Sequence, residues 1–190
     1  GDFEDGYGLT AEDVAATVDR AVAYGLAGIG IEDTTGNPDA PIRDFDQAVE
    51  RVRSAVNAAK RRIVVTARTD NYLQGRPDLD DTIRRLTAFA EVGADVVYAP
   101  FPPDLASLEA IVAAVAPTPV NVLISPADQV LTVAELQAAG VKRISLGPAL
   151  YTNAMTALEQ AARALRAGDI ASATAGIGFD RVGELLTRAS

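Results

Sequence analysis

The sequence contains no cysteine and no histidine. Without cysteine, the chain has no disulfide framework, no thiolate metal site and no cysteine nucleophile. Without histidine, it has no Ser-His-Asp triad and no imidazole-bound zinc. Any metal must therefore be held by oxygen ligands, which suit hard cations such as Mg²⁺. Any acid–base step must use a carboxylate, a lysine, a tyrosine, a hydroxyl group or water.

Basic residues are outnumbered by acidic ones. The 190 residues include 17 Lys and Arg against 26 Asp and Glu, which gives a formal net charge of −9 and a pI near 4.5. Binding to nucleic acid phosphates requires a basic surface, so we predict no nucleic acid partner. No apolar run approaches the length of about 18 residues that a membrane span needs, so we also predict no membrane partner and a cytoplasmic location.

Short β-branched runs alternate with longer Ala-rich segments of helical periodicity. Strands are expected at residues 27–31, 63–67, 94–99, 119–124 and 141–146. Helices are expected at residues 10–24, 45–60, 79–92, 105–115, 133–139 and 149–167. The strand segments are nearly continuous apolar runs, which is typical of parallel strands. Gly25, Gly93 and Gly140 each close a helix before a strand, so the pattern predicts a parallel α/β fold.

Residues 2–4 resemble the end of a further strand, which brings the number of βα units to six. A doubly wound sheet is not favoured, because no G-x-G-x-x-G motif follows a strand. A six-stranded open sheet would leave two hydrophobic edges. We therefore predict a (β/α)₈ TIM-type barrel, which needs eight units, and expect two further units upstream of Gly1. Residues 1–168 would form units three to eight as a single domain, and residues 169–190 a C-terminal helical extension interrupted at Gly176 and Gly178.

Two acids stand at the end of the first strand segment. Asp2 and Glu4 are two residues apart, so in a strand they share one face. Gly6 and Gly8 then allow a tight turn at the end of the strand where barrels place their active sites. Adjacent carboxylates repel unless a cation lies between them. The pair is therefore either a metal-binding site or a solvated acidic turn.

Two more polar clusters follow later strands. Glu32 and Asp33 come directly after residues 27–31 and could reach the same centre, although Asp-Thr-Thr-Gly-Asn-Pro is also strong turn chemistry. Arg68 follows residues 63–67 and is expected to meet an anion, either a substrate carboxylate or phosphate, or a neighbouring acid. Tyr7 and Tyr98 are candidates for a proton relay, with buried packing as the alternative.

The three motifs D-F-E-D-G-Y-G, G-I-G-I-E-D and T-A-R-T-D, in this order and spacing, resemble the isocitrate lyase/phosphoenolpyruvate mutase superfamily. The resemblance extends from Asp2 to about Leu150. It implies a (β/α)₈ barrel in a homo-oligomer, a dimer or a tetramer, with an exchanged C-terminal helix. It also implies binding of Mg²⁺ or Mn²⁺ and of a small carboxylate substrate, a 2-oxo or 2-hydroxy acid. The implied reaction makes or breaks a C–C or C–P bond through an enolate-like intermediate.

The resemblance also implies roles for individual residues. Metal binding is assigned to Asp2, Glu4 and Glu32, and catalysis to Arg68 and Glu32. Substrate binding is assigned to Arg68, Asn121, Gly6 and Tyr7, with Asn121 expected to face the barrel interior.

The sequence departs from the superfamily pattern at two places. Residues 34–41 read T-T-G-N-P-D-A-P, which lacks both the K-K-C-G-H motif of the lyases and the gating loop of the mutases. At the end of the strand expected at residues 94–99, Ala99 and Pro100 occupy the place where lyases of the superfamily have Glu and mutases have His. We therefore expect a Mg²⁺-dependent enzyme for an oxaloacetate- or phosphonopyruvate-like acid, with decarboxylation needing the least acid–base machinery. The alternatives are a phosphoenolpyruvate mutase or carboxyvinyl-carboxyphosphonate phosphorylmutase activity, and a non-catalytic barrel that keeps the metal-binding acids.

Overall fold

The computed structural model describes residues 1–123 and 131–187. The chain forms two compact units, Gly1–Ser145 and Leu146–Ser190, and each is described by itself. The predicted domains, residues 1–168 and 169–190, stay a prediction.

The first unit is built on one parallel sheet. Its strands are β1 (Gly28–Glu32), β2 (Val64–Arg68), β3 (Val96–Tyr98), β4 (Val120–Leu123) and β5 (Arg143–Ser145). They pair in the order of the sequence, and Asp2 adds a parallel bridge to Gly30 on the outer side of β1. All six predicted strand positions are therefore found, although Ile124 lies outside the described residues. Sequential parallel order is typical of (β/α)₈ barrels, whereas a doubly wound sheet reverses its order at one point.

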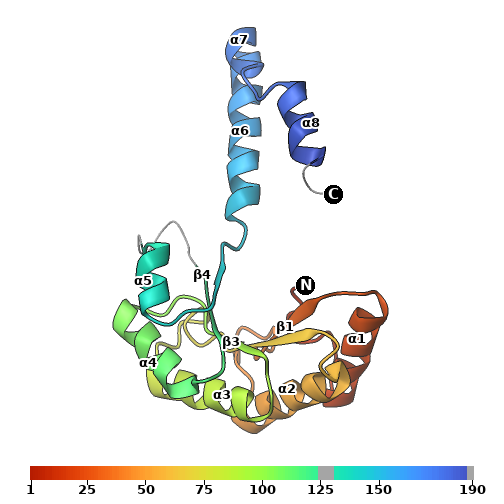
Figure 1. Cartoon of the computed structure of the whole chain (residues 1–190), viewed down its shortest axis with the longest axis vertical. Helices are drawn as coiled ribbons and strands as arrows, with labels where there is room; N and C mark the ends of the chain where they lie inside the picture. The colour runs from red at the N-terminus through yellow and green to blue at the C-terminus, as the bar shows by residue number, and fades with distance from the viewer. Residues whose placement is uncertain (124–130, 188–190) are drawn as a thin grey trace. The chain divides into compact units, whose positions relative to one another are not determined.

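The helices of this unit lie on one face of the sheet. They are α1 (Ala11–Ala23), α2 (Phe45–Ala59), α3 (Leu79–Glu91), α4 (Leu105–Val115) and α5 (Val133–Ala138). Figure 1 shows α1 to α4 following one another along the outside of the curved sheet. The N-terminus of α1 has a complete capping box with Thr10, and Asp78 caps α3. Gly25, Gly93 and Gly140 all have positive φ after their helices, as predicted.

The hydrophobic core fills the space between the helices and the sheet. One cluster contains Ile29, Ile31 and Val65 with residues of α1 and α2, and another surrounds Leu86 and Phe89 of α3. Side chains alternate between faces along a strand, so Glu32 lies on the face opposite to Ile31. The strand register aligns Glu32, Arg68, Tyr98 and Asn121 across four strands. These four polar or aromatic residues therefore share the face that the helices do not cover.

The second unit is helical. It contains α6 (Ala149–Arg166), α7 (Ile170–Ala173) and α8 (Phe179–Thr187), and none of these helices has a buried residue. The helices are interrupted around Gly176 and Gly178, as the sequence predicts. Within residues 1–123 and 131–187, no helix combines the length and apolar character needed to cross a membrane.

Candidate functional site

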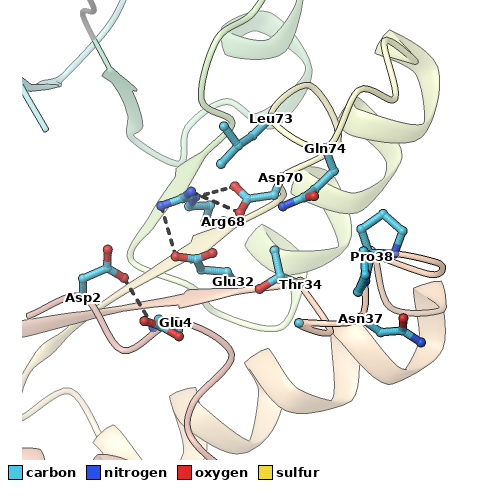
Figure 2. Close-up of a pocket in the computed structure, with 12 residues that line it drawn as sticks. Asp2, Glu4, Glu32, Thr34, Asn37, Pro38, Arg68, Asp70, Leu73 and Gln74 are labelled. Carbon is cyan, nitrogen blue, oxygen red and sulfur yellow. Dashed lines mark hydrogen bonds and ion pairs between the residues drawn. The ribbon is translucent and has the colours of Figure 1, made fainter.

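A pocket of about 470 Å³ lies at the carboxyl ends of β1 and β2. Four of the residues predicted from the sequence line it together, namely Asp2, Glu4, Glu32 and Arg68. Figure 2 shows Arg68 between Glu32 and Asp70, with Asp2 and Glu4 beside Glu32. The remaining wall comes from two loops and contains Thr34, Gly36, Asn37, Pro38, Pro41, Leu73 and Gln74. The strand ends thus bring together residues that are far apart in the sequence.

Arg68 is held on three sides. Its Nη1 lies 3.1 Å from Glu32 Oε1. Its Nε and Nη2 donate to the two carboxylate oxygens of Asp70, with an Nη2–Oδ2 distance of 3.0 Å. The guanidinium carbon lies 5.3 Å from the centre of the Tyr98 ring, within range of a cation–π contact. The predicted pairing with neighbouring acids is therefore present, and the same guanidinium also borders the pocket.

The pocket carries an excess of negative charge. Asp2, Glu4, Glu32 and Asp70 line it, and among the described lining residues Arg68 is the one cationic side chain. Burial raises the pKa of Glu32 to about 8, and the hydrogen bond and charge of Asp70 add to this against the opposing effect of Arg68. Such a site is electrostatically favourable for an added cation.

Asp2, Glu4 and Glu32 are better placed to hold a hydrated ion than to coordinate a metal ion directly. Among the residues the structure describes, no group of three or more carboxylates is close enough to coordinate one metal directly. Asp2 Oδ1 instead accepts a hydrogen bond from the backbone N–H of Glu4 at 3.3 Å. Mg²⁺ usually keeps several of its waters and uses few protein carboxylates. Asp2, Glu4 and Glu32 therefore suit a divalent ion that they contact largely through water.

The acidic turn at the pocket is held in a strained conformation by two arginines. Glu4 and Tyr7 both have positive φ, 46° and 55°, which is unfavourable for residues other than glycine. Arg51 of α2 donates to the carbonyl oxygens of Asp5 and Gly8, and Arg43 donates to Asp5 Oδ2 at 2.6 Å. The arginines fix the turn that carries Asp2 and Glu4. Local sequence patterns do not predict these contacts, because both arginines come from a distant segment.

Three residues assigned to substrate binding do not line the pocket. Gly6 is buried beneath the turn, where an added Cβ would lie 2.8 Å from Val14 Cγ2. Tyr7 is 57% exposed, and its hydroxyl donates to the Asp2 carbonyl at 3.4 Å. Asn121 is 1% exposed and donates to Ser145 Oγ at 3.1 Å. Gly6 thus packs within the turn, and the substrate contacts assigned to Gly6, Tyr7 and Asn121 stay predictions.

Asp70 is the main pocket residue that the sequence analysis did not single out. It is 1% exposed and forms a bidentate pair with Arg68. A carboxylate two residues after a strand-end arginine was the available signal. Thr34 and Asn37 were also missed, because loop residues carry no periodic pattern that marks which of them face a cavity.

Comparison with known proteins places this geometry in a family. Residues 1–166 match the family model described as phosphoenolpyruvate phosphomutase. The chain belongs to this family. A solved 2,3-dimethylmalate lyase is described as a member of the phosphoenolpyruvate mutase/isocitrate lyase superfamily, which confirms the predicted superfamily and the barrel-type fold.

Three relatives illustrate the range of activities in the superfamily. A Burkholderia cenocepacia J2315 protein described as a lyase/mutase is 41% identical, with a TM-score of 0.91, and the match covers 97% of this chain and 68% of that one. Oxaloacetate decarboxylase from Paraburkholderia xenovorans is 32% identical over 89% of this chain and 57% of its own. Oxaloacetate acetylhydrolase in complex with its product oxalate is 29% identical, with a TM-score of 0.83, covering 96% of this chain and 64% of that one.

The chain matches only part of the length of its curated relatives. It spans between 57% and 61% of the length of the curated relatives that it matches along most of its own length.

Proposed function

We propose that this protein is a divalent-metal-dependent enzyme that cleaves a C–C bond in a small 2-oxo acid, with oxaloacetate as the preferred substrate. The observation that carries the proposal is a half-buried, paired Arg68 bordering the same pocket as Asp2, Glu4 and Glu32. This arrangement combines a site for a carboxylate with a site for a hard cation. The oxaloacetate decarboxylase and oxaloacetate acetylhydrolase relatives support the choice of substrate.

Each residue in the pocket has a chemical task under this proposal. Arg68 binds the substrate carboxylate through the free side of its guanidinium, while Glu32 and Asp70 fix its orientation. Asp2, Glu4 and Glu32, which line the pocket, would hold a hydrated Mg²⁺ or Mn²⁺. When bound, this cation polarises the 2-oxo group and stabilises the negative charge that develops on its oxygen.

Decarboxylation suits the groups that the chain offers. The bond between C3 and C4 of oxaloacetate breaks, CO₂ leaves, and the electron pair stays on the three-carbon fragment. No base is needed to start this step, and a proton from water completes pyruvate. The chain has neither cysteine nor histidine, so a reaction that begins with proton abstraction is served less well by the described pocket.

The proposal is tested by turnover. The protein is incubated with oxaloacetate and Mg²⁺, and pyruvate is measured through lactate dehydrogenase, with Mg²⁺ alone subtracted as the metal-catalysed background. We expect formation of pyruvate that EDTA abolishes and added Mg²⁺ restores. Absence of pyruvate, together with conversion of phosphonopyruvate to phosphoenolpyruvate in ³¹P NMR, would instead support a phosphonomutase. That second candidate is favoured by the description of the matching family model.

The metal site is tested separately by titration calorimetry. Replacing Asp2 and Glu32 together with alanine is expected to weaken Mg²⁺ binding at least tenfold, because both acids line the proposed site. Glu50→Ala serves as the control, because Glu50 is an exposed acid paired with Arg53 on α2. Unchanged affinity in the double variant would show that the ion is held elsewhere. If the wild type binds Mg²⁺ but turns over neither oxaloacetate nor phosphonopyruvate, a non-catalytic barrel is supported instead.

A further inference from the structure

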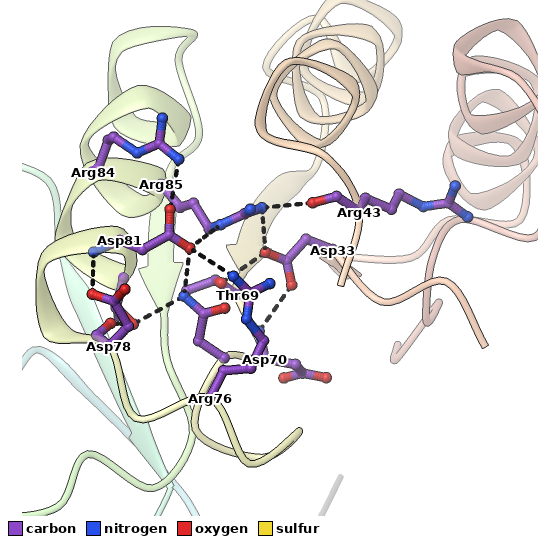
Figure 3. Close-up of polar contacts among 11 residues, drawn as sticks. Asp33, Arg43, Thr69, Asp70, Arg76, Asp78, Asp81, Arg84 and Arg85 are labelled. Atoms are coloured by element: carbon purple, nitrogen blue, oxygen red, sulfur yellow. Dashed lines mark hydrogen bonds and ion pairs between the residues drawn. The ribbon is translucent and has the colours of Figure 1, made fainter. Parts of the chain in front are cut away.

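A buried acid lies directly behind the pocket, next to Glu32 in the chain. Asp33 is 2% exposed. Its Oδ2 accepts hydrogen bonds from Thr69 Oγ1 at 2.7 Å and from Arg85 Nη1 at 3.2 Å. Its Oδ1 accepts a hydrogen bond from the backbone N–H of Asp70 at 2.9 Å. Figure 3 shows these contacts converging on Asp33. Both carboxylate oxygens are thus engaged, and neither lines the pocket.

Arg85 connects this acid to α3 and to the segment before α2. It is 4% exposed, and its Nη1 also donates to the Arg43 carbonyl at 3.0 Å. Its Nε donates to Asp81 Oδ2 at 2.7 Å, and Asn71 Nδ2 donates to the same oxygen at 3.0 Å. The network therefore fastens the segment after β2 to α3 at two points, through Asp33 and through Asp81.

The network leads to Arg68 by one continuous path. Asp33 accepts hydrogen bonds from the Thr69 hydroxyl and from the Asp70 backbone N–H, and the Asp70 carboxylate forms a bidentate pair with the Arg68 guanidinium. The backbone N–H of Asp33 also donates to the Arg68 carbonyl at 3.1 Å. Breaking a buried ion pair is costly, whereas an apolar replacement of similar shape is often as stable. A buried pair at this place is therefore better suited to orienting a neighbour than to stabilising the fold.

We propose that Asp33 is a positioning residue which, with Thr69 and Arg85, holds Asp70 so that the Arg68 guanidinium faces a bound carboxylate. This inference rests on the proposed function, in which Arg68 binds that carboxylate. None of the three residues of the Asp33–Thr69–Arg85 network lines the pocket, and their hydrogen bonds reach it through Asp70 and Arg68.

Four variants separate positioning from general stability. Asp33→Asn keeps the shape of the side chain but removes its charge and one acceptor. Thr69→Val removes only the hydroxyl that donates to Asp33, whereas Thr69→Ser retains it. Arg84→Gln is the control, because Arg84 donates to Asp81 Oδ1 at 2.6 Å and has no hydrogen bond to Asp33. Thermal melting first establishes which variants are folded at the temperature of measurement.

Two readouts are then taken on the folded proteins. The first is the rate at which the Arg68 Nε–H proton exchanges with water, measured by NMR. Its ¹H–¹⁵N signal is identified as the one that is lost in Arg68→Lys. The second is the dissociation constant of oxalate in the presence of Mg²⁺, measured by calorimetry. We expect Asp33→Asn and Thr69→Val to speed exchange and to weaken oxalate binding about tenfold. Thr69→Ser and Arg84→Gln are expected to stay within about twofold of the wild type.

The outcomes distinguish the inference from the proposed function. If Thr69→Val melts at a lower temperature but keeps the Arg68 signal and the oxalate affinity, the network only stabilises the fold and the inference is overturned. If Asp33→Asn does not fold, Thr69→Val decides the question alone. If the wild type does not bind oxalate while the Arg68 signal still loosens in the variants, positioning stands and the proposed carboxylate binding is wrong.

Discussion

At the scale of single residues, the geometry around Arg68 shows why the type of cation matters. Its planar guanidinium reaches Glu32 and both oxygens of Asp70 at once while lying over the Tyr98 ring. A lysine ammonium is a compact charge that lacks this flat, forked arrangement of donors. Lysine at this position would keep the charge of the pocket but lose the fixed direction of the donors.

We therefore expect Arg68→Lys to lower kcat/KM for a 2-oxo acid at least tenfold, which corresponds to about 1.4 kcal/mol or more of lost transition-state stabilisation. Steady-state kinetics on both proteins measure this effect. Arg53→Lys, in an exposed pair with Glu50, is the matched control and should leave the kinetics unchanged. Wild-type kinetics in Arg68→Lys would mean that Arg68 serves only its ion pairs.

Asp81 connects a single ionisable group to the stability of the fold. Burial alone would raise the pKa of Asp81, but hydrogen bonds from Arg84, Arg85 and Asn71 outweigh it and hold the pKa well below its usual range. A carboxyl group with a lower pKa in the folded state stabilises the fold above its unfolded pKa of about 3.9. This contribution is lost as the pH falls from there toward the folded pKa.

This pH dependence can be tested by removing the charge of Asp81. Asp81→Asn should lower the free energy of unfolding near neutral pH, and the difference from the wild type should shrink as the pH falls below about 4. Urea unfolding at a series of pH values measures both curves. Asp80→Asn changes an exposed acid in the same helical turn and should leave the curve unchanged. A difference that stays constant with pH would show that the charge of Asp81 is not responsible.

At the scale of elements, the strands and helices were predictable from the sequence. The buried side-chain contacts behind the pocket were not. Apolar runs and closing glycines marked the strands, and acids or an arginine at three strand ends marked Asp2, Glu32 and Arg68. Arg85, by contrast, occupies a position on α3 that resembles any helix-surface arginine in the sequence. Only the packing of α3 against the loop after β2 reveals that it is buried beside Asp33. Such partners depend on tertiary contacts, which local patterns do not encode.

The turn between the Asp2 bridge and α1 illustrates a second limit of sequence patterns. The pattern predicted that Gly6 permits a tight turn, and its φ of 90° agrees. It did not show that the fully buried Val14 side chain fills the space beside Gly6. Glycine is therefore required there for two reasons, the backbone conformation and the lack of room for a methyl group.

A pair of matched substitutions separates these two reasons. Gly25 also has a positive φ, 76°, but an added Cβ there would meet no atom within 4 Å. Gly25→Ala is thus expected to cost only the backbone penalty, about 1 kcal/mol. Gly6→Ala should cost at least about 1 kcal/mol more, because it also overpacks against Val14. Equal losses of unfolding free energy in denaturant titrations would show that Val14 moves aside freely.

At the scale of the whole molecule, the two units differ in how they bury apolar side chains. The first unit encloses its core between one sheet and its helices. Helix α6 in the second unit has no buried residue. Its large apolar side chains include Tyr151, Met155, Leu158 and Leu165, which are between 42% and 66% exposed. These positions, together with Ala162, follow one another at spacings of four and three residues. That spacing is typical of a helix that packs along one seam against another helix.

We propose that a second copy of this chain covers this seam, in line with the homo-oligomer implied by the superfamily resemblance. An identical partner is favoured because closed, symmetric contacts between copies are the commonest form of oligomer. The wild type should then run as a dimer or tetramer when its mass is measured by light scattering after gel filtration. Leu158→Glu, which places a charge in the seam, should shift it to smaller species. Gln160→Glu adds the same charge on the opposite side of α6 and should leave the mass unchanged. A monomeric wild type, or an oligomer that survives Leu158→Glu at micromolar concentration, would show that the seam is not where copies meet.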